Sequence, residues 1–135
     1  MNAPAQAGLP ALSLKDPRLF REQCYLGGAW RSADSSGSIK VNNPATGEII
    51  GTVPDMGAAE ARRAVEAADR AWPAWRAKTA KERAVLLRKW YDLMMGNQDD
   101  LGLLLTTEQG KPLPEAKGEI AYGASFIEWF AEEGK

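Results

Sequence analysis

The chain has 135 residues, of which 44% are hydrophobic and 26% charged, and 17 basic against 18 acidic side chains give a net charge of −1. This length allows at most one domain, and the composition is that of a globular protein rather than a disordered one. The balanced charge argues against a nucleic-acid or membrane-surface protein, and no apolar run is long enough to span a membrane.

The first 18 residues are predicted to form a flexible tail. Ala, Pro and Gly dominate it as far as Leu12, and Asp16-Pro17 marks a turn or a helix start. The opening residues lack a basic start followed by an apolar stretch, so they do not have the pattern of a signal peptide.

A β-hairpin is predicted after this tail. Leu19-Phe20 and residues 24–26 are the first apolar anchors. Gly27-Gly28 predicts a tight turn that opens onto a strand beginning with Ala29-Trp30. Residues 32–37 are polar and are predicted to form a loop.

A second pair of strands follows. Residues 38–41 alternate between polar and apolar as a half-buried strand does, and residues 48–53 form the returning strand, which ends at Pro54. Between them Pro44 presets φ and Gly47 can adopt a positive φ, so this stretch is predicted to reverse the chain.

From residue 57 the spacing of apolar residues becomes helical. Gly57 is the predicted N-cap of a first helix, with Glu60 three residues later, and Pro73 is expected to end it. A capping box at residues 79–82 opens a second helix that ends near Gly96. The apolar stripe of the first helix consists of Ala61, Ala64, Val65, Ala68, Ala71 and Trp72.

Two further helices complete the chain. Asn97 is predicted to cap a short one, and Pro114 lies near the first position of the last one. The last helix is predicted to face inward through Ala116, Ile120, Gly123, Ile127, Phe130 and Ala131. The sequence therefore predicts an α/β fold in which a small N-terminal β element precedes about four helices.

Cys24 is the only cysteine. It cannot form an internal disulfide, which favours a reducing, cytoplasmic compartment. A nucleophilic thiol needs a lowered pKa and an open pocket, and the strand-like run around Cys24 indicates neither, so an inert structural role is expected.

Other patterns favour structural roles. Gly110-Lys111 fails as a phosphate loop, since Leu105 and Pro112 occupy positions that require glycine and Ser or Thr, and no dinucleotide-binding glycine motif occurs. No histidine is present to work with the acidic residues, which are predicted to form a solvated face. The aromatic residues are expected in the core or at interfaces; they include Trp72, Trp75, Trp90, Tyr122, Phe126, Trp129 and Phe130.

Five segments, in this order and spacing, resemble the N-terminal part of the aldehyde dehydrogenases. They are YLGGAW (residues 25–30), VNNPATGEII (41–50), TVPDM (52–56), EQGKP (108–112) and EIAYGASFIEWFAEE (119–133). The last segment resembles most the NAD(P)-dependent succinate-semialdehyde dehydrogenases. The resemblance implies that residues 19–135 are an incomplete part of the Rossmann-like cofactor-binding domain of such an enzyme.

The resemblance also implies a function. A cysteine would add to the aldehyde, hydride would pass to the nicotinamide, and water would release the acid. The family's cysteine, glutamate base, oxyanion asparagine and cofactor-binding strands all lie beyond the matching region, so no catalytic, cofactor-binding or metal residue is assigned here. NAD or NADP would be bound by those later regions. The backbone near Glu108 lies close to a monovalent-cation site in some members, although a structural turn is the favoured interpretation.

The last helix borders the substrate tunnel in this family. The positions matching Gly123, Phe126 and Ile127 lie near that tunnel, while packing alone remains the competing interpretation for each. A cytoplasmic homo-oligomer, a dimer or tetramer, is implied, with an aldehyde substrate and without nucleic-acid or membrane partners. Two alternatives stay open: a betaine- or aliphatic-aldehyde dehydrogenase, and a truncated, non-catalytic interaction module.

Overall fold

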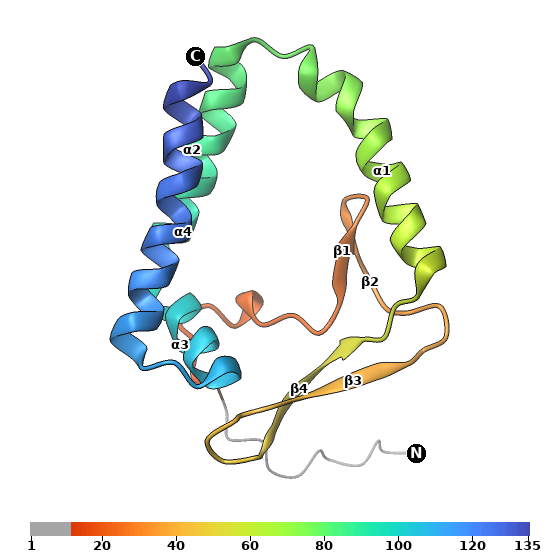
Figure 1. The fold of residues 1–135 in the computed structure, drawn as a ribbon, viewed down its shortest axis with the longest axis vertical. Coiled ribbons are helices and arrows are strands. Elements are labelled where there is room, and N and C mark those ends of the chain that lie inside the picture. Colours follow the sequence, from red (N-terminus) through yellow and green to blue (C-terminus); the bar gives the residue numbers. More distant parts are fainter. Residues whose placement is uncertain (1–11) are drawn as a thin grey trace.

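The computed structural model describes residues 12–135 and confirms the predicted α/β order of two hairpins followed by four helices (Figure 1). A short 3-10 helix, Pro17–Leu19, precedes them. The strands and helices are β1 (Cys24–Leu26), β2 (Ala29–Arg31), β3 (Ser38–Asn42), β4 (Ile49–Pro54), α1 (Ala58–Arg76), α2 (Ala80–Gly96), α3 (Gln98–Gln109) and α4 (Leu113–Glu133).

Both hairpins are antiparallel and turn where glycine permits a positive φ. Gly27 and Gly28 have φ values of +60° and +84°, which the β1–β2 turn requires. Gly47 has a φ of +75° in the turn between β3 and β4, as predicted. The β3–β4 register runs from Ser38 opposite Pro54, with an irregularity after Val41.

α1 begins as predicted but does not end at Pro73. The Glu60 carboxylate accepts the backbone N–H of Gly57 at 3.1 Å, which satisfies one free donor at the helix start. The helix continues through Pro73 to Arg76, so the predicted end was wrong. Pro73 removes only one donor from the last turn, and its own carbonyl still accepts the Ala77 N–H at 3.1 Å.

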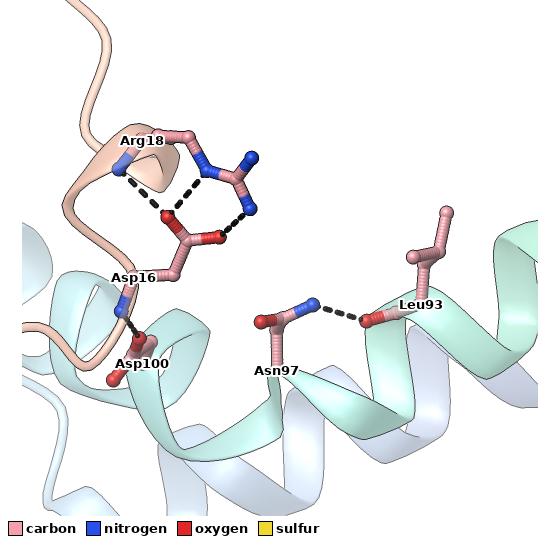
Figure 2. Close-up of polar contacts among 5 residues, drawn as sticks. All are labelled: Asp16, Arg18, Leu93, Asn97 and Asp100. Atoms are coloured by element: carbon pink, nitrogen blue, oxygen red, sulfur yellow. Dashed lines mark hydrogen bonds and ion pairs between the residues drawn. The ribbon is translucent and has the colours of Figure 1, made fainter.

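The capping box of α2 is confirmed. Thr79 Oγ1 accepts the Glu82 N–H at 3.3 Å, and the Glu82 carboxylate accepts the Thr79 N–H at 2.7 Å. Asn97 lies at the junction of α2 and α3, but its side chain does not cap α3. It donates instead to the Leu93 carbonyl at 2.8 Å, so it closes the end of α2 (Figure 2).

The helices form two unequal groups. α2 and α4 lie side by side with α3 packed against α4, whereas α1 stands on the other side of the molecule, near the β1–β2 hairpin (Figure 1). The buried hydrophobic residues among those described are all alanines: Ala33, Ala84, Ala116, Ala124 and Ala131. Alanine contacts bring helices close together but bury little area, so many large apolar side chains remain exposed.

The predicted N-terminal tail is only partly described. Residues 1–11 lie outside the described residues. In the remainder, the backbone N–H of Lys15 donates to the Asp100 carboxylate at 3.1 Å. The backbone N–H of Asp16 donates to the same carboxylate at 2.8 Å (Figure 2), so this segment is held against α3. Arg18 then bonds the Asp16 carboxylate. None of the helices within residues 12–135 combines the length and the hydropathy that crossing a membrane requires.

Candidate functional site

α4 has two different apolar faces. One is a buried stripe of small residues, Ala116, Ala124 and Ala131, through which α4 contacts the other helices. The opposite side is an aromatic face, defined by Tyr122, Phe126, Trp129 and Phe130, whose members are 48% to 66% exposed. The Tyr122 and Phe126 rings meet edge to face at 4.8 Å between centroids, which orders part of this face without covering it.

The structure separates the three predicted tunnel residues. Phe126 lies on the aromatic face, whereas Gly123 and Ile127 are half-buried at its border. A Cβ atom at Gly123 would meet no other atom within 4 Å, so no described side chain requires glycine there. Phe130 is 62% exposed, so its predicted inward position was wrong. Ala131, the next residue, was also predicted to face inward and is buried.

A shallow hollow follows the aromatic face. Its lining combines the four aromatic residues with the polar side chains of Ser125, Glu128, Glu132 and Glu133. Such a surface can hold an apolar group. Two of its three carboxylates, those of Glu128 and Glu132, are ion-paired with Arg88 of α2.

Ion pairs fix α4 against its neighbours. Arg88 of α2 donates to Glu128 at 2.5 Å and to Glu132 at 2.7 Å, and these hydrogen bonds raise the pKa of the guanidinium. At the other end, Asp99 of α3 accepts from Lys117 at 2.7 Å. These exposed pairs contribute little energy individually, and they link α4 to α2 at one end and to α3 at the other.

Cys24 lies on β1 and not on α4, which carries the aromatic face. It is half-buried in β1, opposite Arg31 of β2. No cluster of three His, Cys, Asp or Glu residues suited to a metal ion occurs within the range 12–135. The hollow on α4 can position an apolar group.

Two of the segments that carry the family resemblance lie in contact. Gly110 ends α3 with a φ of +80°, and a Cβ atom there would lie 3.0 Å from Cγ of Pro44 in the β3–β4 turn. Glycine is therefore required twice over, by its conformation and by the close approach of the proline ring. Three of the glycine-bearing segments place their glycines in turns or at a helix end, and the fourth places Gly123 inside α4.

The family model for the aldehyde dehydrogenase family matches residues 30–135. The chain belongs to this family. Over 92% of its length it is 71% identical to glutarate-semialdehyde dehydrogenase of Pseudomonas aeruginosa and 61% identical to the NADP(+) succinate-semialdehyde dehydrogenase GabD of Escherichia coli. In each case it spans only 26% of the relative, so it covers about a quarter of the length of these curated relatives.

A solved structure agrees with this aldehyde dehydrogenase assignment. Succinate-semialdehyde dehydrogenase from Burkholderia pseudomallei matches 91% of the chain with a TM-score of 0.89 and 68% sequence identity, and 26% of that protein is covered. The two hairpins and four helices are therefore the N-terminal part of an aldehyde dehydrogenase fold.

Proposed function

We propose that the chain is the N-terminal part of an NAD(P)-dependent aldehyde dehydrogenase that oxidises a semialdehyde with a terminal carboxylate, such as succinate or glutarate semialdehyde. One observation carries this proposal: the identities of 71% and 61% to relatives whose names specify these two substrates. The substrates differ by one methylene, which separates binding only by about 1–3 kcal/mol in an apolar pocket. Residues 19–135 would form part of the cofactor-binding domain of this cytoplasmic enzyme, with residues 1–18 as a tail.

The described residues would line part of the substrate tunnel and would not supply the groups that react with the aldehyde. Phe126 on the aromatic face, with Gly123 and Ile127 at its border, would line the substrate tunnel beside the aliphatic part of the aldehyde. The open space at Gly123 and the apolar lining of the hollow support this role. The nicotinamide cofactor would supply hydride acceptance, and NAD or NADP would be held by residues outside this chain.

The proposal is tested with the complete reading frame expressed as an enzyme. We expect kcat/KM for succinate and glutarate semialdehydes to exceed that for pentanal, an uncharged aldehyde of similar length, by roughly tenfold to a hundredfold, as a charge-assisted contact of about 1.5–3 kcal/mol provides. Measurements with NAD and with NADP determine the preferred cofactor. Higher kcat/KM for betaine aldehyde or pentanal would refute the substrate class and favour the alternative dehydrogenases.

The 135 residues by themselves should not reduce NAD or NADP with any aldehyde. The reason is that the cysteine and the glutamate base of this family are expected in segments beyond the matching region, and Cys24 is a half-buried residue of a short strand. Turnover above a buffer blank that disappears in Cys24→Ser would contradict this expectation. An inactive product of the complete frame, with intact folding, would instead support a non-catalytic interaction module.

A further inference from the structure

The β3–β4 ribbon has two outer edges, and the hydrogen-bond pattern identifies which backbone groups face them. In an antiparallel pair, successive residues direct their N–H and C=O groups alternately toward the partner strand and away from it. Asp55 donates to the Gly37 carbonyl at 2.9 Å, next to the first residue of β3. The alternation then makes the backbone groups of Ser38, the next residue of β3, point outward. The same holds for Lys40 and for Thr52, which lies opposite Lys40 on β4.

The outer edge of β4 is already occupied. The Thr52 N–H donates to the Glu22 carboxylate at 2.7 Å, and the Thr52 hydroxyl donates to the same oxygen at 3.1 Å. Pro54, at the next outward position, has no N–H group. Phe20 lies so close to Gly51 that a Cβ atom there would be 2.6 Å from its ring. A further strand therefore cannot add to this side.

The outer edge of β3 is open. Within residues 12–135, the outward N–H and C=O groups of Ser38 and Lys40 have no backbone partner, because β4 is the only strand paired with β3. On one face of the ribbon, Ile39 is 52% exposed and its cross-strand partner Val53 is 40% exposed. An open edge beside an exposed apolar face is the arrangement that accepts an added strand.

The positive charge of Lys40 at the outer edge of β3 indicates which kind of segment can pair with this edge. The register that pairs all of β3 with a second copy of β3 would place Lys40 opposite Lys40, and like charges directly opposed are destabilising. Residues 1–11 contain no Asp or Glu, so they cannot offer a carboxylate to this lysine. The chain covers 26% of its relatives, so most of the polypeptide of such an enzyme lies outside it.

We propose that β3 accepts, by strand addition, an extended segment from the rest of the same enzyme polypeptide, with an acidic side chain opposite Lys40. The inference rests on the proposed function, since that function supplies the remaining polypeptide. The added strand bonds the outward groups of Ser38 and Lys40 and extends the apolar face formed by Ile39 and Val53. In this way it anchors the N-terminal ribbon to the body of the enzyme.

Amide hydrogen exchange of the complete enzyme, resolved to single residues by mass spectrometry, tests the proposal. The inward amides of Ile39 and Val41 report whether the ribbon itself is formed. With the ribbon formed, the outward amides of Ser38 and Lys40 should exchange at least a hundredfold more slowly than unstructured amides. Fast exchange at these two positions beside slow exchange at the inward ones would overturn the proposal. Protection that depends on enzyme concentration would also overturn it, because the strand would then come from a second subunit.

Charge variants test the acidic partner. Lys40→Gln should reduce the protection of the amides of residues 38 and 40 severalfold, and Lys40→Glu should reduce this protection further. Lys89→Glu is the control, because it makes the same charge change at an exposed position on α2 and should leave the protection unchanged. Unchanged protection in Lys40→Glu would refute the acidic partner. An enzyme that oxidises semialdehydes without protecting Ser38 refutes only this inference, and a protected but inactive enzyme refutes only the proposed function.

Discussion

Two glycines inside helices, Gly123 in α4 and Gly102 in α3, should respond in opposite ways to alanine. A Cβ atom at Gly123 would meet nothing within 4 Å, whereas at Gly102 it would lie 2.8 Å from Cγ and 3.4 Å from the backbone nitrogen of Lys117. Alanine gains about 1 kcal/mol over glycine in a helix interior. Gly123→Ala should therefore stabilise the chain by about that amount. Overpacking costs about 1–3 kcal/mol, so Gly102→Ala should be destabilising by roughly 1 kcal/mol net.

Urea unfolding of the 135-residue chain, followed by helical circular dichroism at concentrations where the transition no longer depends on concentration, measures both effects. Gly118→Ala is the matched control, because Gly118 is exposed on α4 and a Cβ atom there also meets nothing within 4 Å. Gly118→Ala should raise the unfolding free energy by the same amount as Gly123→Ala, which corresponds to a melting temperature higher by roughly 3 °C. The reasoning is refuted if Gly118→Ala is stabilising but Gly123→Ala is destabilising, as Gly102→Ala is expected to be. That result would mean that the border of the aromatic face is packed.

Four further outcomes are expected. Asp100→Ala should lower the unfolding free energy by about 2 kcal/mol, because two partly buried backbone N–H groups lose a charged acceptor; unchanged urea midpoints would contradict this. Hydrogen bonds from Lys117 and Lys15 lower the pKa of Asp99 from 3.8 to about 2, so the native state loses this stabilisation as the pH falls from about 4 toward 2. Urea midpoints in that range should depend less on pH in Asp99→Asn, and equal dependence would refute the role of the pairs. In the complete enzyme, Gly123→Leu should reduce turnover of bulky aldehydes more than of small ones at a nearly unchanged melting temperature; equal loss that tracks stability would make it a packing glycine. The 135-residue chain should bind a hydrophobic dye and self-associate, and a monomeric, cooperatively melting chain without dye binding would contradict the exposed apolar faces.

The local features of the fold could be predicted from sequence. Gly27, Gly28 and Gly47 were identified as turn residues because the positive φ that they adopt is favoured by glycine alone. The capping box that starts at Thr79 was predictable because both of its partners lie within one helical turn. Pro73 was misjudged, since a proline in the last turn of a helix costs one donor and need not end it.

Features that depend on distant parts of the chain were not predictable. The Asp100 carboxylate binds backbone groups that lie far earlier in the sequence, and no local pattern distinguishes it from the neighbouring Asp99. The contact of Gly110 with Pro44 likewise joins two turns that the sequence presents separately. Phe130 was assigned inward because α4 is apolar on both sides, so periodicity alone could not determine which side meets α2.

The two faces of α4 connect the stability of this part of the chain with its proposed role at the substrate. Contacts through Ala116, Ala124 and Ala131 bring α4 close to its neighbours and leave the bulky rings pointing outward. Because alanine burial stabilises little, most of the apolar area of α4 lacks a partner among the described residues. Under the proposed function, substitution of Trp129 would change folding and substrate binding together. Gly123 is a position where the two effects can be separated, since a small side chain fits there without moving any described atom.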